Sequence, residues 1–147
     1  MNKKLWLGFV AVFILVFLLD YVVNMFLMSA EYEQTRQLWR AEADMKMGVI
    51  IVAELFFAFF FTFIFSKGYE GKGIMEGLRY GLYVSLMMNI PAAYMTYATM
   101  PVPYMLALKW FLYGTVEYLI YGAALALIYG KTKRAGAAEI KTMETAA

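Results

Sequence analysis

The sequence predicts an all-α integral membrane protein, a bundle of four transmembrane helices with both termini in the cytoplasm. Of its 147 residues, 63% are hydrophobic, and the mean hydropathy is +0.62. Soluble domains are only about half apolar. The apolar residues also gather into four runs, each close to the ~20 residues that a helix needs to cross the hydrocarbon core. Composition and run length therefore predict the same class.

The four predicted spans form one domain, residues 1–130. They cover residues 5–28, 47–65, 80–100 and 104–129. The first run follows two lysines and has the apolar core of a signal peptide. However, apolar residues continue beyond Asp20, and Met28 is poorly suited to the third position before a cleavage site after Ala30. We therefore expect an uncleaved first span.

The segments between the runs are predicted to differ in kind. Residues 29–46 are polar and long enough to let the first helix extend outward before the chain turns back. Residues 67–73 (KGYEGKG) have three glycines and predict a flexible cytoplasmic turn. Residues 100–103 (MPVP) predict a tight outer turn. The small and polar residues of 131–147 predict a disordered cytoplasmic tail.

The orientation follows from the distribution of lysine and arginine. Nine basic residues flank the predicted cytoplasmic ends of the spans: Lys3, Lys4, Lys67, Lys72, Arg79, Lys131, Lys133, Arg134 and Lys141. The loop 29–46 has only three basic residues, which four acidic residues offset. Because cytoplasmic loops carry the excess of positive charge, both termini are predicted to be cytoplasmic.

Composition also limits the chemistry of the chain. With no Cys and no His, it cannot supply the usual ligands of haem, iron–sulfur clusters or zinc, nor a Cys/His nucleophile–base pair. We expect no cofactor, and any metal would have to bind through oxygen. The net charge of +2 is distributed as membrane topology requires, so nucleic acid is not an expected partner. The expected partners are the lipid bilayer and other membrane subunits or a second copy of the chain.

Three carboxylates, Asp20, Glu54 and Glu117, lie inside predicted spans. A carboxylate at membrane depth needs a partner or a proton, so these residues are expected to face the inside of the bundle. Counting from the outer ends places Lys109 at a depth similar to those of Asp20 and Glu54. We therefore expect Lys109 to pair with one of these two acids, and Glu117, the deepest, to be a neutral acid.

Polar residues of four spans make up a candidate intramembrane site. In the fourth span, polar residues recur at four-residue steps and form one slowly winding stripe. The site comprises Asp20, Asn24, Glu54, Asn89, Lys109, Tyr113, Glu117 and Tyr121. One interpretation is structural, with tyrosine hydroxyls satisfying Glu117; the other is a path for protons or cations. The structural interpretation is favoured, and both remain open.

Small residues predict where the third and fourth spans meet. They recur at four-residue spacing in both spans: Gly77, Gly81 and Ser85 in one, and Gly122, Ala126 and Gly130 in the other. Such faces let two helix backbones approach closely, so a contact near the cytoplasmic side is expected.

One part of the chain resembles a known group of proteins. Residues 67–81 (KGYEGKGIMEGLRYG) are followed by Pro91, by the prolines of the outer turn, and by a stretch with Trp110, Gly114 and Glu117. Together they resemble a group of small, uncharacterised four-span bacterial membrane proteins, most clearly over the last two spans. The resemblance implies a multi-pass protein of the bacterial inner (cytoplasmic) membrane and implies no activity.

The expected function is that of an accessory, assembly or scaffolding subunit of a membrane complex or a homo-oligomer. Four short spans leave little room for a self-contained catalytic site, so an enzyme is not expected. The first alternative is a proton- or cation-coupled transporter or channel that uses the three buried carboxylates. The second is a lipid-directed membrane enzyme with acids as general acid and base, although no paired acidic motif at metal-binding spacing is present.

Overall fold

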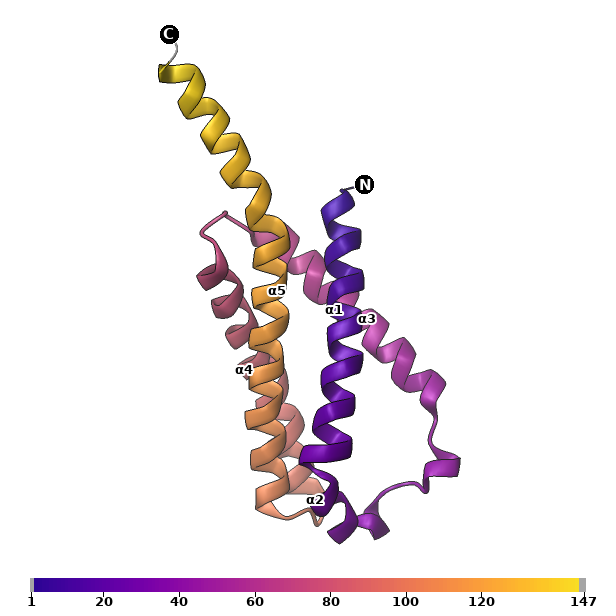
Figure 1. Ribbon diagram of the computed structural model, residues 1–147. Coiled ribbons are helices and arrows are strands. Elements are labelled where there is room, and N and C mark those ends of the chain that lie inside the picture. Colours follow the sequence, from indigo (N-terminus) through magenta and orange to yellow (C-terminus); the bar gives the residue numbers. More distant parts are fainter. Residues whose placement is uncertain (1, 146–147) are drawn as a thin grey trace.

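The computed structural model describes the backbone of residues 2–145 and the side chains of residues 2–130. Its long elements are α1 (Lys3–Val22), α3 (Met47–Gly68), α4 (Ile74–Thr99) and α5 (Tyr104–Thr145) (Figure 1). Short elements follow α1: the π-helical turn η1 (Val23–Leu27), α2 (Ser29–Gln34), and the 3₁₀ turns η2 (Arg36–Leu38) and η3 (Glu42–Asp44). No strand occurs among the described residues. The predicted all-α class is confirmed.

Three helical segments are long and apolar enough to cross a membrane. They are Lys3–Leu27, Met47–Gly68 and Tyr104–Gly130. The fourth predicted span lies in α4, which has 26 residues but is less apolar than the other three. Its role as a span stays a prediction. The predicted tail, 131–147, lies outside the residues whose side chains are described, and its disorder also stays a prediction.

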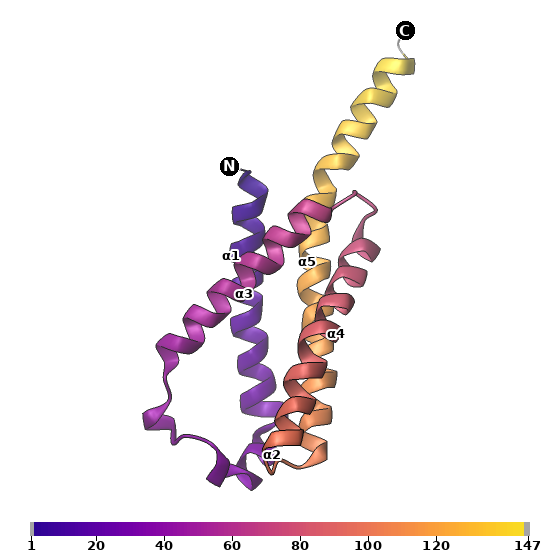
Figure 2. The same ribbon diagram turned by 180° about the vertical axis from the view of Figure 1, so that it is seen from behind.

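The long helices form a bundle with one member set at an angle. α4 and α5 run side by side in opposite directions, α1 packs against α5, and α3 crosses α1 obliquely (Figures 1 and 2). α1 begins and α5 ends at the same end of the molecule, which we call the inner end. The turn between α4 and α5 and the short helix α2 lie at the opposite, outer end.

Glycines bring the backbones of α4 and α5 into contact. A Cβ atom added at Gly77 would lie 2.1 Å from the carbonyl oxygen of Gly122, and one added at Gly122 would lie 2.0 Å from that of Gly77. Gly81 is as close to Tyr118, with 2.2 Å to its carbonyl oxygen. Ser85, which is buried, donates a hydrogen bond of 2.9 Å to Thr115 across the same interface.

Not every predicted small residue lies in this contact. Ala126 does, because its Cβ is 2.7 Å from a Cβ added at Gly77. Gly130 instead lies near the hydroxyl of Tyr69, at 3.3 Å from its added Cβ. The interface therefore ends before Gly130, at the turn that joins α3 to α4.

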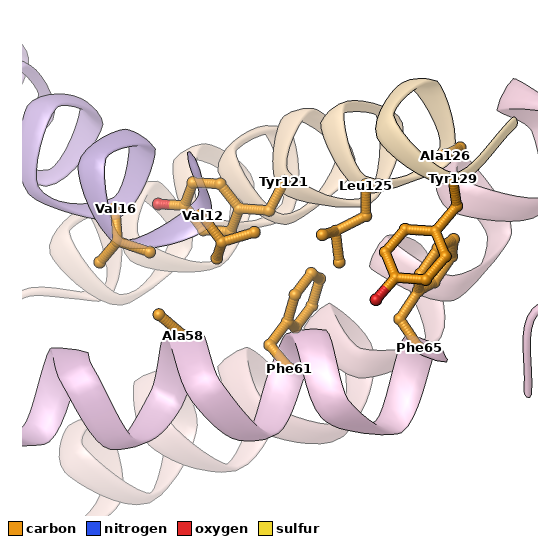
Figure 3. Close-up of a cluster of buried hydrophobic side chains, with 9 residues drawn as sticks. All are labelled: Val12, Val16, Ala58, Phe61, Phe65, Tyr121, Leu125, Ala126 and Tyr129. Carbon is orange, nitrogen blue, oxygen red and sulfur yellow. The ribbon is translucent and has the colours of Figure 1, made fainter. Parts of the chain in front are cut away.

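A buried apolar cluster joins α1, α3 and α5 in the inner half of the molecule. Figure 3 shows its members, Val12, Val16, Ala58, Phe61, Phe65, Tyr121, Leu125, Ala126 and Tyr129. Gly8 lets α1 approach, since an added Cβ would lie 2.9 Å from side-chain atoms of both Leu125 and Thr62. Dispersion between closely packed side chains, rather than exclusion of water, favours such contacts in a membrane. The inner half of the bundle is thus filled.

The outer half of α3 is different. Residues 47–53 are exposed on every side, whereas Ala58, Phe61, Thr62 and Phe65 are buried. α3 therefore packs through its inner half and leans away from α1 and α5 toward its beginning (Figures 1 and 2). This divergence leaves room between α1 and α3 at the outer end.

Replacing either interfacial glycine should destabilise the bundle. We expect Gly77→Ala and Gly122→Ala each to lower the free energy of unfolding by about 1–3 kcal/mol, because the added methyl collides with a backbone carbonyl that cannot yield. Gly48→Ala is the matched control, since nothing lies within 4 Å of its added Cβ. Thermal unfolding in mild detergent measures the difference, and equal stability of Gly122→Ala and Gly48→Ala would contradict the packing.

Candidate functional site

The candidate site is a cavity of about 360 Å³ between α1, α3, α4 and α5, toward the outer end. Its lining combines polar, aromatic and apolar side chains. They are Val16, Asp20, Val23, Asn24, Met28, Ala53, Glu54, Phe57, Asn89, Trp110, Tyr113, Gly114, Glu117, Tyr118 and Tyr121. Toward the inner end the cavity borders on the apolar cluster, to which its lining residues Val16 and Tyr121 also belong.

Seven of the eight residues predicted for a polar site line this cavity. They are Asp20 and Asn24 of the first helical segment, Glu54 of α3, Asn89 of α4, and Tyr113, Glu117 and Tyr121 of α5. The four-residue spacing in α5 turns three of these side chains toward the same space. Lys109, the eighth, is not among the lining residues.

Asp20 lies close to both of the other carboxylic acids. The carboxyl groups of Asp20 and Glu117 are near enough to share a single proton. Glu54 is close enough to Asp20 for electrostatic repulsion. No Lys or Arg occurs among the described residues that line the cavity. The acids therefore share one space without a basic side chain to neutralise them.

The environment of Glu117 leaves part of its carboxyl group without a partner. The residue is 8% exposed, and its Oε1 atom makes no hydrogen bond within the described part of the chain. The expected hydrogen bonds from tyrosine hydroxyls to this carboxyl group are not formed by Tyr113 or Tyr121 there. Glu54 also has one buried, unpartnered oxygen, Oε2. Buried acceptors of this kind are costly unless something binds them.

Lys109 pairs with Glu31, and the predicted pairing with Asp20 or Glu54 was wrong. The Lys109 ammonium donates a hydrogen bond to Glu31 Oε1 in an ion pair at the outer end. The reason is that α2 folds back over the beginning of α5, so a carboxylate at the boundary is nearer to the flexible lysine stem than the acids within the bundle. Lys109 is the only basic residue of α5 before residue 131, and in this pair its ammonium group is bound to Glu31 and not to the acids of the cavity.

A chain of hydrogen bonds ties α2 to the rim of the cavity. Trp110 Nε1 donates to the Tyr32 hydroxyl at 2.9 Å, and this hydroxyl donates to Asn24 Oδ1 at 2.8 Å. Asn24 Nδ2 in turn donates to the backbone carbonyl of Asp20 at 2.8 Å. Asn24 lies in the π-helical turn η1, a type of distortion that is frequent at functional sites. Tyr32 of α2 is thus linked, through Asn24, to the backbone beside Asp20.

A second network holds the α4 side of the cavity. Asn89 Nδ2 donates to Ser85 Oγ at 3.0 Å, and Ser85 donates to Thr115 at 2.9 Å. Gly114 makes room for Asn89, because a Cβ added there would lie 2.6 Å from Asn89 Nδ2. The Asn89 amide is therefore fixed against α5, where it lines the cavity.

Sequence reasoning missed eight lining residues of the cavity, and it also missed two residues near its rim, Glu31 and Tyr32. Glu31 and Tyr32 lie in the polar loop, which was not considered for contacts with the spans, and Trp110, one of the eight, entered only through the resemblance. The residue types of Glu31, Tyr32 and Trp110 give a partial sequence signal for the outer end. An acid and two aromatic hydrogen-bond donors are residue types that suit the ends of membrane helices. Their pairing depends on the path of residues 23–35, which the sequence pattern does not specify.

The fold and the cavity define a class: a helical membrane protein with an acidic cavity between its apolar helices. Comparisons with protein-family models, with curated proteins and with solved structures found no match to the chain. The resemblance to small four-span bacterial membrane proteins therefore stays a prediction. Within the described residues, no group of three or more Asp and Glu side chains is arranged to hold a metal ion.

The pair of Glu31 with Lys109 should stabilise the outer end in a pH-dependent way. The hydrogen bond from the Lys109 ammonium holds the pKa of Glu31 below its ordinary value of 4.5. The stabilisation should therefore be complete above pH 4.5 and be lost as the pH falls through the lowered pKa. Glu31→Gln should lower the thermal stability at pH 7 and remove this part of the pH dependence.

Glu33→Gln is the control for this variant, because Glu33 lies in the same short helix and its ion pair with Arg36 is exposed to solvent, where such a pair contributes little. A double-mutant cycle with Lys109→Met should show losses that are less than additive, whereas a cycle of Lys109→Met with Asp20→Asn should be additive. Coupling to Asp20 without coupling to Glu31 would restore the original sequence prediction and contradict this pairing.

Proposed function

We propose that the protein is a proton- or cation-coupled transporter of the bacterial inner membrane and that its acidic cavity is the coupling site. One observation carries the proposal: Asp20, Glu54 and Glu117, from three different helices, line one cavity together with no basic side chain among the described lining residues. This arrangement moves the transporter, at first the alternative, ahead of the accessory subunit.

The physical argument rests on the cost of charge in a membrane. On the insertion scale, an acid at the centre of a membrane helix costs about 2.5–3.5 kcal/mol when it is charged. Three acids in one cavity can reduce this cost by taking up protons or by binding a cation. Because a proton and a cation neutralise the same carboxyl oxygens, they compete for the site, and this competition couples the movement of protons to the movement of the cation.

The two halves of the bundle suit the proposal. The cavity lies in the outer half, beside the part of α3 that leans away, and the apolar cluster closes the inner half. Transport requires the inner half to open in turn. α3 contributes Phe61 and Phe65 to that cluster, so a rocking motion of α3 would open the inner end while bringing its outer half toward α1.

The proposed topology includes α4 as a fourth span. A helix of 26 residues is about 39 Å long, which exceeds the ~30 Å of hydrocarbon. With four spans, both termini lie on the same side, and the excess of Lys and Arg favours the cytoplasm for that side.

An accessory or scaffolding role is the second candidate. Residues 47–53 are exposed all round the helix, and among the described residues no other helix covers this part of α3. Another membrane subunit, or a second copy, would find an uncovered apolar helix there. The same surface is also compatible with lipid, so the acidic cavity is the stronger support and transport is the function we favour.

Flux measurements test the proposal. In proteoliposomes that contain a pH-sensitive dye, the wild-type protein should move protons when a cation gradient is imposed. Glu117→Gln keeps the shape of the protonated acid but cannot release a proton, so it should fold normally and lose this flux. Asp44→Asn, at an exposed acid of the outer connection, should retain it. Absence of flux in the wild-type protein with every monovalent cation tested would contradict the proposal.

Labelling from outside tests the topology. Because the chain has no Cys, a single introduced cysteine is the only thiol. In intact cells from which any outer membrane has been removed, Gln34→Cys should react with an impermeant thiol reagent, and Gly71→Cys should react only after lysis. The reverse pattern would overturn the orientation.

A further inference from the structure

We infer that the cavity binds an organic cation, an ammonium group on an aromatic or other apolar body, and that this ligand enters from the outer leaflet between α1 and α3. The inference rests on the proposed function and deepens it, because it names the chemical class of the transported cation.

The charge of the cavity calls for a cation. Asp20, Glu54 and Glu117 line it without a basic neighbour among the described residues. Glu117 lines the cavity with 8% of its surface exposed, and its Oε1 is buried without a hydrogen-bond partner, so its carboxyl group lacks a donor. An ammonium group supplies both the missing charge and, when it bears hydrogen, the missing hydrogen-bond donor.

The size and chemistry of the cavity favour an organic ligand over a bare metal ion. Its volume of about 360 Å³ lies within the range of about 300–1,000 Å³ that is typical of small-molecule sites. Val16, Val23 and Met28 supply an apolar wall on the side of α1 and η1. A divalent ion needs several oxygen ligands at short distance. No group of three Asp and Glu side chains in the described part of the chain provides them.

Aromatic rings line the side of the cavity formed by α3 and α5. The ring centroids of Phe57 and Tyr118 are 5.1 Å apart, and those of Tyr118 and Tyr121 are 5.7 Å apart. All three residues line the cavity, together with Trp110 and Tyr113. Aromatic faces attract organic cations, and the attraction strengthens when water is excluded. Acids and rings in one space therefore match the two ends of an amphipathic cation.

The opening of the cavity lies beside the exposed part of α3. Ala53 lines the cavity and is itself exposed, as are residues 47–52 before it. Since an apolar helix segment of this kind lies in the bilayer, the mouth between α1 and α3 faces lipid. An amphipathic cation concentrates at the interface of the outer leaflet, from which this mouth is the shortest way to the acids.

Binding of a permanent organic cation tests the inference. The probe is benzyltrimethylammonium, which carries a fixed charge on one aromatic ring, and calorimetry measures its binding to the full chain in lipid nanodiscs. We expect saturable binding, weakened at least about tenfold by Asp20→Asn and by Glu117→Gln. Asp44→Asn is the control and should bind as the wild type does. Neopentylbenzene, the uncharged isostere, should not displace the probe.

A second pair of variants tests the mouth. Ala53→Trp should slow association of the probe because it narrows the opening, whereas Gly48→Trp, on the same helix with nothing near its added Cβ, should not. Glu54→Gln provides a further acid variant if Asp20→Asn and Glu117→Gln do not fold, and it should also weaken binding. Equal association rates for Ala53→Trp and Gly48→Trp would overturn entry between α1 and α3.

The outcomes separate the inference from the proposed function. Failure of the folded wild-type protein to bind the probe, with flux of protons or inorganic cations intact, would overturn the inference and leave the transporter. Binding of the probe that depends on Asp20 and Glu117, without any flux, would support the inference and count against transport. Binding that persists unchanged in all the acid variants would overturn the inference.

Discussion

A carboxylate that is surrounded by hydrocarbon must hold a proton or a cation, and this constraint governs the outer half of the molecule. Asp20, Glu54 and Glu117 come from three helices that could each have turned these side chains elsewhere, yet all three line one cavity. Lys109, which the sequence predicts as their partner, is paired with Glu31 at the outer boundary. Neutralisation is thereby left to a proton or to a ligand, which is the basis of the proposed transport.

The inner half of the bundle supplies the rigidity that such a site needs. Backbone contact at Gly77 and Gly122 fixes α4 against α5, and the aromatic cluster around Phe61 joins α3 to both α1 and α5. The outer half of α3 has no comparable packing. The proposed rocking of α3 therefore meets little packing at the outer end, whereas at the inner end it must open the contacts of Phe61 and Phe65.

Much of this arrangement follows from sequence patterns, and the remainder depends on the path of one loop. Apolar run length predicted the all-α class, and the four-residue spacing from Tyr113 to Tyr121 predicted a polar face that the structure turns into the cavity. The partner of Lys109 was not predictable from depth alone. It depends on the π-helical turn η1 and on the return of α2, which place Glu31 over α5. The tilt of α3 could not be predicted from the sequence either, because apolar residues surround this helix and define no preferred packing face.

The central claim is that Asp20 and Glu117 lie next to each other in the lining of one cavity, and cross-linking tests it most directly. The chain contains no Cys, so a protein with Asp20→Cys and Glu117→Cys has only these two thiols. A short bifunctional thiol reagent should join them efficiently. A protein with Asp20→Cys and Lys109→Cys should not be joined, since Lys109 lies eight residues, or about 12 Å, farther along α5. Efficient cross-linking of Asp20→Cys to Lys109→Cys, and none to Glu117→Cys, would contradict the account.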